Sequence, residues 1–467
     1  MVLPGRVIVF DIGKTLAKLS LWDPDGRLLE QWTRRNLEID VAGHRCLDVE
    51  GIEAWAIEVM SGFARKGAVF AIVPVGHGAA AAVVRQGRLA CAVTDYEASI
   101  TPELRSQYDA LRDPFTATGS PALPDGLNLG VQLYRLGVEQ PGVLQGEARI
   151  LPWPQYWAWR MCGVTAAEIS SLGCHTDLWR PAQHQPSDLA HGQGWAQRLA
   201  PLRHAREALG TLTPEWFART GLSPQVRVLC GLHDSNAALL AARGFPELAG
   251  QEATTLSTGT WFVAMRTPGR GERLDPTTLS ETRDCLVNVD VDGQPIPSAR
   301  FMGGRELELL GGLYGQDDNN GLSSVLTAGS FVLPGWVPGV GPYPHSKGRW
   351  IAKPGTSAGQ SAAIALYAAL MVDRMLDLIG AKERLLIEGR FAQCSLFVQA
   401  LAQMRPGTQV YVNGGADGGV SYGALRLIDP ELPSPGELQR VAPLRADLSG
   451  YKAQWLSLAE AEYSAPA

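Results

Sequence analysis

The sequence lacks the features of two large classes of protein. No uncharged apolar stretch reaches the ~18–20 residues that a membrane-spanning helix needs. The nearest candidate, residues 360–372, is rich in alanine and polar at its start, so we interpret it as part of a buried helix. The first ten residues also lack the long apolar region and the cleavage site of a secretory signal peptide. We therefore expect no membrane partner.

Cysteine is sparse and shows no pattern. The seven cysteines are an odd number, lie far apart and form no C-x-x-C pair. This distribution fits neither a framework of disulfides nor a zinc site with cysteine ligands. Reduced thiols in a cytoplasmic compartment agree best with it.

Runs of basic residues are absent as well. The net charge is −6, and no cluster of lysine or arginine marks a nucleic-acid-binding face. We therefore expect no nucleic-acid partner, although single basic side chains can still bind the phosphate of a small ligand. Hydrophobic residues make up 45% and charged residues 19%, which is typical of a globular protein. A chain of 467 residues is too long for one ordinary core and indicates two domains.

What the sequence does contain is a repeated order of strands and helices. Strands are predicted at 6–10, 17–22, 27–33, 68–75 and 226–231, and helices at 51–66, over most of 128–223 and at 359–380. This alternation predicts a layered α/β fold. The segment ATTLSTGTWFVAM, residues 253–265, predicts a hairpin like the one at the N-terminus, with glycine and threonine at both bends. We infer an internal duplication, with domains at 1–243 and 244–467.

The first bend, FDIGKT at residues 10–15, groups residues suited to a phosphate. Gly13 permits a tight turn whose backbone N–H groups can approach an anion. Lys14 offers positive charge and Thr15 a hydroxyl, while Asp11 could hold Mg²⁺ through its carboxylate. An ordinary hairpin with a surface lysine explains the segment equally well, because it lacks the spacing of a P-loop.

The second bend, STGTW at residues 257–261, offers hydroxyls and a glycine amide. Alone it is better explained as a threonine-rich strand end, but its pairing with the first bend favours a second phosphate contact.

Asp234 follows the strand at 226–231, where catalytic groups of α/β folds collect. A helix N-cap is an equally good explanation for Asp234. The adjacent His233 is more often a structural residue than a catalyst.

Other segments give weaker signals. The glycine turns at 388–391 and 413–416 suit the packing of a flat ring on the backbone, but they are equally common as plain connections. The aromatic segment 151–161 is better explained as a buried cluster than as a surface that stacks on bases. His77, Asp95 and Glu97 could contact the hydroxyls of a polar ligand, or the two carboxylates could simply face solvent.

Taken together, these motifs resemble the FGGY carbohydrate kinases, which belong to the ATPase group of actin, hexokinase and Hsp70. DIGKTLAK is similar to the family's first phosphate motif, Asp-x-Gly-Thr-x-x-x-Lys/Arg, and STGTW to its second. GLHDSNAAL resembles the form found in rhamnulose and fuculose kinases. The segment LPWPQYWAWRMCGVTAAEISSLGCHTDLW resembles the part that precedes the family's sugar pocket. The order and spacing match along nearly the whole chain.

The resemblance implies a fold and an activity. The fold is α/β, with two actin-like (ribonuclease H-like) ATPase domains and a cleft between them. The activity is Mg²⁺-assisted transfer of the γ-phosphoryl group of ATP to a small sugar, a ketose or deoxyketose such as L-fuculose or L-rhamnulose. A polyol kinase acting on a glycerol-like acceptor and a non-catalytic sugar-sensing protein of the same fold are the alternatives. A homodimer is the family expectation.

The resemblance also implies roles for individual residues. Asp234 aligns with the general base and Asp11 with the Mg²⁺-associated aspartate, and both are predicted to contact the metal. The predicted nucleotide-binding residues are Asp11, Gly13, Lys14, Thr15, Lys18, Thr258, Gly259, Thr260, Gly303, Gly304, Gly389, Arg390 and Phe391. The predicted sugar-binding residues are His77, Asp95, Glu97 and His233. Two positions depart from the family pattern: Lys14 replaces a small hydroxyl residue, and Gly389-Arg390-Phe391 replaces a common Gly-Gly-Gly.

Overall fold

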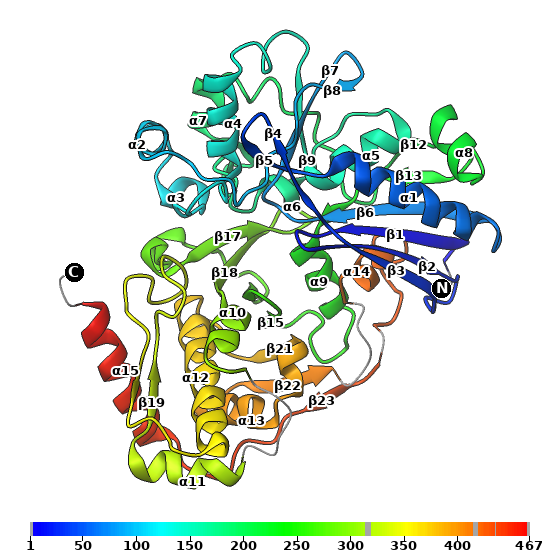
Figure 1. Cartoon of the computed structure of the whole chain (residues 1–467). Helices are drawn as coiled ribbons and strands as arrows, with labels where there is room; N and C mark the ends of the chain where they lie inside the picture. Colours follow the sequence, from blue (N-terminus) through cyan, green and yellow to red (C-terminus); the bar gives the residue numbers. More distant parts are fainter. Residues whose placement is uncertain (1–2, 313–318, 414–418, 435, 465–467) are drawn as a thin grey trace. The chain divides into compact units, whose positions relative to one another are not determined.

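The computed structural model describes residues 3–312, 319–413, 419–434 and 436–464 (Figure 1). The chain forms two compact units. Unit 1 comprises residues 1–244, 287–295 and 418–434, and unit 2 comprises 245–286, 296–417 and 435–467. The predicted boundary after residue 243 treats the rest of the chain as one domain, whereas the contacts group two later segments with unit 1.

Unit 1 is built on a mixed sheet with the order β12-β13-β6-β1-β2-β3, and β14 also pairs with β6. The strands are β1 (Arg6–Ile12), β2 (Leu16–Trp22), β3 (Leu28–Arg35), β6 (Val69–Gly76), β12 (Ala208–Thr211), β13 (Arg227–Leu229) and β14 (Leu232–His233). β1 runs antiparallel to β2 and parallel to β6. This register places Asp11 opposite Lys18 on one side and opposite Val75 on the other.

Helices cover both faces of this sheet. α1 (Val49–Ala64), α5 (Trp153–Cys162) and α8 (Pro214–Thr220) contribute to the core that contains Ile8, Phe10 and Ile12. α9 (Asp234–Ala242) and α14 (Gly419–Arg426) contribute to the core on the other face, with Val7 and Val9. Because both faces are buried, the strand sequences are continuous apolar runs rather than alternating ones. The predicted strands at 6–10 and 68–75 and the helix at 51–66 are confirmed.

The helices α9 and α14 pack unusually closely. A Cβ atom at Gly423 of α14 would lie 1.7 Å from the carbonyl oxygen of Ala237 in α9. Only glycine fits at this contact, and the alanines of α9 keep the facing surface shallow. A helix near the C-terminus of the chain thereby supports the helix that begins at Asp234 (Figure 1).

The remaining part of unit 1 is less helical than predicted. Its elements are α2 (Pro102–Asp109), α3 (Phe115–Thr118), α4 (Leu129–Glu139), α6 (Ile169–Leu172), α7 (Asp188–Gly192), β4 (Glu38–Val41), β5 (His44–Leu47), β7 (Ala81–Arg85), β8 (Arg88–Leu89), β9 (Arg149–Pro152), β10 (Trp179–Arg180) and β11 (Gln185–Pro186). The prediction of mostly helix over 128–223 is wrong, because short strands and turns separate the helices. The aromatic cluster is buried, as its simpler interpretation predicts: Trp153 is 1% and Trp157 0% exposed.

Unit 2 repeats the central arrangement of unit 1. Its sheet has the order β17-β18-β16-β15-β21-β22-β23. The strands are β15 (Ala253–Thr258), β16 (Phe262–Thr267), β17 (Cys285–Val289), β18 (Pro295–Phe301), β21 (Arg384–Gly389), β22 (Gln409–Asn413) and β23 (Leu438–Arg440). β15 runs antiparallel to β16 and parallel to β21, which matches the pairing of β1 with β2 and β6. The predicted hairpin at 253–265 is therefore confirmed.

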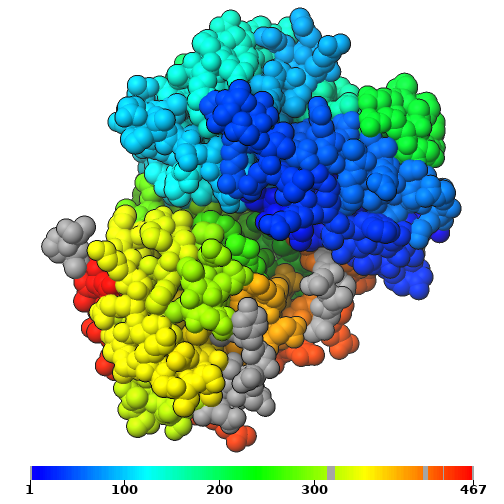
Figure 2. Space-filling view, in the orientation of Figure 1, coloured from blue at the N-terminus to red at the C-terminus, as the bar shows by residue number. Residues whose placement is uncertain are grey.

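The other elements of unit 2 are α10 (Gly303–Leu309), α11 (Asn319–Ala328), α12 (Ser357–Leu378), α13 (Ser395–Met404), α15 (Ser449–Tyr463), β19 (Phe331–Leu333) and β20 (Arg349–Ile351), with short 3₁₀ turns at 276–278, 281–283 and 390–393. The long helix predicted at 359–380 corresponds to α12, which is buried along most of its length. Among the helices of the described residues, none combines the length and the apolar character needed to cross a bilayer. The α/β class with two related sheets is as predicted. The edge strand β3 is mostly exposed, and the dark blue N-terminal part of the chain, to which it belongs, reaches the surface of unit 1 in the space-filling view (Figure 2).

Candidate active site

A buried carboxylate lies at the end of β1. Asp11 has only 8% of its side chain exposed, and its Oδ2 lies 3.4 Å from Nζ of Lys18 on β2. Burial raises the pKa of Asp11 to about 6, the charge of Lys18 opposes that rise, and the charge of Asp234 adds to it. The mutual repulsion indicates that Asp11 and Asp234 are electrostatic neighbours within unit 1. A buried carboxylate with a second carboxylate near it is an arrangement suited to a cation shared by both.

Asp234 is the first residue of α9, and the N-cap position belongs to His233. His233 makes no side-chain cap bond, and Oδ1 of Asp234 accepts from N and Oγ of the next residue, Ser235, at 2.6 and 3.4 Å. This contact differs from an N-cap, in which the side chain accepts from the second or third helical N–H. The carboxylate is also 30% exposed, so a ligand can reach it. The geometry therefore leaves Asp234 available for chemistry.

The imidazole of His233 lies beside this carboxylate. Its Nε2 is 3.2 Å from Oδ1 of Asp234, and its Nδ1 is 3.5 Å from Nδ2 of Asn236. Burial lowers the pKa of His233, so the neutral ring is favoured at neutral pH. An amide donor at Nδ1 favours the tautomer that carries its proton on Nε2, which can donate to Asp234. His233 thus contacts the predicted base directly.

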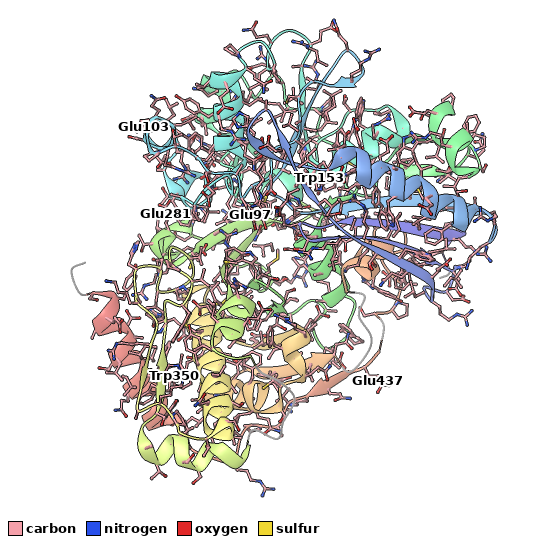
Figure 3. All side chains as sticks on the ribbon, viewed as in Figure 1. Glu97, Glu103, Trp153, Glu281, Trp350 and Glu437 are labelled. Carbon is pink, nitrogen blue, oxygen red and sulfur yellow. The ribbon has the colours of Figure 1, made fainter. Side chains whose placement is uncertain are left out.

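His77 follows β6 and is buried between aromatic rings. Its ring centroid lies 5.7 Å from that of Tyr96 and 6.3 Å from that of Trp153, which Figure 3 labels. Burial lowers the pKa of His77 to about 4, and the charges of Asp234 and Asp95 oppose this fall. Its Nε2 is buried and has no hydrogen-bond partner among the described residues. A buried ring nitrogen without a partner is suited to bind a ligand hydroxyl.

Lys14 makes its contacts on the side of Asp95. Its Nζ forms an ion pair with Asp95 and lies 3.3 Å from Oε1 of Glu38 and 3.6 Å from Oε2 of Glu97. The same Nζ lies 5.3 Å from the centroid of the Tyr96 ring. The residue predicted to bind phosphate is therefore held by carboxylates, among them the two that were predicted to bind sugar.

Asp95 is fully buried, and both of its oxygens are occupied. Oδ2 accepts from Lys14 and, at 3.0 Å, from Nε of Arg45, while Oδ1 accepts from the backbone N–H of Glu97. These donors hold the pKa of Asp95 below its usual value despite burial. Glu97, which Figure 3 labels, is half-exposed and pairs with Arg45. Of the two carboxylates among the predicted sugar contacts, Glu97 is accessible, whereas Asp95 positions Lys14 and Arg45.

Sequence reasoning missed Arg45 and Glu38, which complete this ion-pair network. Both lie on the hairpin of β4 and β5, whose strands pair Glu38 with Leu47 and Asp40 with Arg45. The available signal was the alternation of polar and apolar residues around Ala42-Gly43, which favours a hairpin. Oxygens of Glu38, Asp95 and Glu97 lie within 4.8 Å of one another. Because Lys14 and Arg45 neutralise this group, it is better described as an ion-pair network than as a metal site.

The second predicted phosphate loop lies in unit 2. Gly259 and Thr260 are exposed at the tip of the hairpin, whereas Thr258 is 2% exposed. The hydroxyl of Thr258 donates to the carbonyl of Glu388 and accepts from N of Phe391 at 3.3 Å. Thr258 thus fastens β15 to β21 and to the turn that follows. The groups that a ligand can reach here are the exposed ones at the tip.

The glycine pair at the start of α10 packs directly against this tip. N of Gly304 donates to the carbonyl of Thr260 at 3.2 Å, and a Cβ atom at Gly304 would lie 2.0 Å from the carbonyl oxygen of Gly259. A Cβ atom at Gly303 would lie 2.6 Å from the ring of Phe262. The structure therefore brings together the predicted residues 258–260 and 303–304.

The turn after β21 requires glycine at its first position. Gly389 has a φ of +90°, and a Cβ atom there would lie 2.4 Å from the carbonyl oxygen of Thr258. Arg390 is exposed and lies 2.8 Å from Glu308. Phe391 is 7% exposed, and its ring packs 5.3 Å from that of Phe262. The Phe391 side chain thus belongs to the core, so its backbone is the part that can contact a nucleotide. In the turn at 413–416, residues 414–416 lie outside the described residues.

Comparisons with known proteins find similarity to carbohydrate kinases. A family model described as "Carbohydrate kinase FGGY, C-terminal domain" matches residues 250–435. A carbohydrate kinase from Novosphingobium aromaticivorans is 49% identical over 98% of this chain and 99% of its own, with a TM-score of 0.91. No curated protein matches the sequence.

More distant solved structures share the fold. A ligand-bound xylulose kinase from Lactobacillus acidophilus is 12% identical with a TM-score of 0.81, over 98% of this chain and 99% of its own. A glycerol kinase from Plasmodium falciparum, solved with ADP, is 12% identical with a TM-score of 0.79, over 98% of each chain. At this level of identity the similarity concerns the fold alone, which spans nearly the whole chain.

Proposed function

Because this chain belongs to the FGGY family of carbohydrate kinases, we propose that its acceptor is a small ketose or deoxyketose such as L-fuculose or L-rhamnulose. The enzyme is an ATP-dependent phosphotransferase with an alcohol group as acceptor. The observation that supports phosphoryl transfer to a hydroxyl most is the carboxylate of Asp234, which lies at the start of α9, is 30% exposed, and acts electrostatically on both Asp11 and His77.

In this proposal Asp234 is the general base. Its Oδ1 is fixed by the N–H of Ser235 and lies beside Nε2 of His233, so the carboxylate has a defined orientation before the sugar binds. It would accept the proton of the attacking hydroxyl. Such a base contributes typically ~10²–10⁴-fold to the rate. The rest of the catalysis is positioning and stabilisation of charge, as is usual for phosphoryl transfer.

Mg²⁺ fits the pair of carboxylates formed by Asp11 and Asp234. Both offer oxygen ligands, which hard divalent cations prefer. The raised pKa of Asp11 reports burial and a neighbouring negative charge, and a bound cation would relieve both penalties. When bound, Mg²⁺ supplies positive charge to the phosphate oxygens. Lys18, which lies 3.4 Å from Asp11, would keep Asp11 oriented.

We assign the sugar and the first phosphate loop to the domain at 1–243, and the nucleotide to the domain at 244–467. On the sugar side, we propose the buried Nε2 of His77, which has no partner among the described residues, and the half-exposed carboxylate of Glu97, with the ring of Trp153 as an apolar wall beside His77. On the nucleotide side, we propose the backbone of 259–260 and 389–391 and the hydroxyl of Thr260.

Two further expectations accompany this function. The scattered cysteines support a cytoplasmic location. Family membership supports a homodimer, which size-exclusion chromatography with light scattering tests: a molar mass of one chain would contradict it.

A panel of acceptors with MgATP tests the proposed substrate. L-fuculose, L-rhamnulose, D-xylulose, gluconate and glycerol would each be assayed for acceptor-dependent release of ADP. We expect the highest kcat/KM with a ketose or deoxyketose. Preference for glycerol would replace the proposal with a polyol kinase, and the absence of turnover with every acceptor would favour a sugar-sensing protein.

A further inference from the structure

The backbone that carries Asp234 has little regular structure of its own. β14 consists of only Leu232 and His233, which pair with Val75 and Gly76 of β6. Gly231, directly before it, has a φ of +77°, and a Cβ atom there would lie 2.1 Å from the carbonyl oxygen of Pro74. Two residues of strand pairing fix a backbone poorly, so other contacts must hold this segment in place.

One such contact comes from the residues around α6. The backbone N–H of His233 donates to Oγ of Ser170 at 3.2 Å, and Oγ of Ser170 donates to Oε2 of Glu168 at 2.6 Å. Ser170 and Glu168 are both 0% exposed. The hydroxyl of Ser170 therefore stands between a buried carboxylate and the residue directly before Asp234. Because a hydroxyl has one proton, donation to Glu168 leaves its lone pairs for His233.

Glu168 is itself held by several donors. Its Oε1 accepts from N of Ser170 at 3.0 Å, and its Oε2 accepts from N and Oγ of Ser171 at 3.1 and 3.2 Å. Glu168 therefore caps α6 and fixes the rotamer of Ser170 at the same time. A helix N-cap needs only the bonds from backbone N–H groups, whereas Glu168 also accepts from the hydroxyls of Ser170 and Ser171.

A second contact comes from α5. Nε2 of Gln155 donates to the carbonyls of Cys230 and Gly231, at 3.2 Å each. Gln155 is also 0% exposed. Side chains of 155 and 170 thus bind consecutive parts of the segment 230–233 from two different elements. Two carbonyls of the segment before Asp234 accept hydrogen bonds from Gln155, and one of its N–H groups donates to Ser170.

We propose that Glu168 and Ser170 are positioning residues for the catalytic base, and that they act by fixing the backbone of His233 so that the carboxylate of Asp234 is held in its reactive orientation. The proposal rests on the proposed function of Asp234. Ser170 does not contact the sugar or the nucleotide in this account. Its effect is expected in kcat, because misplacement of a reacting group by about 1 Å costs up to ~10²-fold in rate.

Ser170→Ala is the first test, with Ser187→Ala as its matched control. Ser187 is likewise 0% exposed, and its Oγ accepts from N of Ala190 and donates to the carbonyl of Asp177. Both variants lose a buried hydroxyl with two hydrogen bonds in unit 1, so we expect similar falls in melting temperature. We expect Ser170→Ala to lower kcat by about 10- to 100-fold, with the KM of the acceptor and the Kd of MgADP unchanged. Ser187→Ala should keep kcat.

Glu168→Gln keeps the proposal testable if Ser170→Ala does not fold. The amide retains the size of Glu168 but keeps only one acceptor oxygen for the four donors of Ser170 and Ser171. The hydroxyl of Ser170 remains as an acceptor for the N–H of His233, so we expect a smaller fall in kcat than for Ser170→Ala, again with unchanged KM. Equal kcat for Ser170→Ala, Ser187→Ala and the unaltered enzyme would overturn the inference alone. No turnover by the unaltered enzyme with any acceptor of the panel would overturn the proposed function, and this inference with it.

Discussion

The hairpins of the two units have the same backbone plan and opposite chemistry. In each, three residues join two antiparallel strands, and the glycine after the first strand donates back across the turn at 3.1 Å. In each, the first strand also pairs in parallel with a later strand of the sheet. The first hairpin carries Asp11, Lys14 and Lys18, whereas 257–261 contains no charged residue.

The two hairpins therefore use different groups: charged side chains in unit 1, and backbone groups with hydroxyls in unit 2. In unit 1 the charged side chains bind one another: Lys18 contacts Asp11, and Lys14 contacts Asp95. In unit 2 the hairpin offers backbone groups and the hydroxyl of Thr260, and its stability comes from glycine packing and from the bonds of Thr258. We infer that the first hairpin takes part in the chemistry, while the second provides a neutral cradle.

The largest effect is expected at the reacting group. Asp234→Asn removes the acceptor of the hydroxyl proton but keeps the size of the side chain, so kcat should fall by about 10²–10⁴-fold. The Kd of ADP without Mg²⁺ should change far less, because the nucleotide is assigned to the hairpin of unit 2 and Asp234 to the metal and the sugar hydroxyl. Steady-state kinetics and isothermal titration calorimetry measure the two quantities. Near-normal kcat would mean that Asp234 serves only as part of α9.

A substitution next to the uncharged hairpin of unit 2 should act through packing. Gly304→Ala places a Cβ atom 2.0 Å from the carbonyl oxygen of Gly259, so the hairpin tip or α10 must move. We expect a loss of about 1–3 kcal/mol in the free energy of unfolding, as for overpacked sites, together with weaker MgADP binding. Urea unfolding and calorimetry test this. The control is Gly407→Ala, where a Cβ atom meets no atom within 4 Å.

The buried acid behind the base predicts a dependence of stability on pH. Burial raises the pKa of Glu168 to about 7, above its usual value of 4.5. The folded state therefore binds a proton more tightly than the unfolded state, and this contribution is complete below pH 4.5 and is lost as the pH rises toward 7. By linkage the loss amounts to about 3 kcal/mol.

Glu168→Gln cannot titrate, so its free energy of unfolding should not include this fall. The difference in stability between the unaltered protein and Glu168→Gln should shift in favour of the variant from pH 5 to pH 8. Urea unfolding at a series of pH values measures it. A constant difference across that range would contradict the raised pKa.

Lys14→Thr restores the residue type usual in the related family. Asp95 is fully buried and would keep Arg45 as its remaining cation, so we expect a loss of about 1–3 kcal/mol in the free energy of unfolding. If Lys14 acts through Asp95, as the contacts indicate, the KM of the acceptor should rise while that of MgATP stays constant. A rise in the KM of MgATP alone would indicate instead that Lys14 binds the phosphates of ATP.

These contrasts also separate what the sequence can predict from what it cannot. The strands at 6–10 and 68–75 and both hairpins were predictable, because apolar runs and glycine bends are local signals. The partner of Lys14 was not, because a flexible lysine side chain can reach several groups and the choice depends on distant residues. The packing of α14 on α9 depends on one close contact at Gly423, and no local sequence pattern predicts this contact. The region 128–223 was misjudged because its short elements lack a clear period.

The smallest effect is expected at the exposed tip of the neutral hairpin. Thr260 is exposed, so Thr260→Ala should change the free energy of unfolding by less than about 0.5 kcal/mol. If its hydroxyl binds a phosphate oxygen, the affinity for MgADP should fall by the value of one hydrogen bond, about 0.5–1.5 kcal/mol. Calorimetry resolves this change, and the matched variant Thr15→Ala applies the same loss to the exposed hydroxyl of the charged hairpin. Equal losses would mean that both tips bind phosphate, whereas a loss confined to Thr260→Ala would assign ADP to the neutral hairpin.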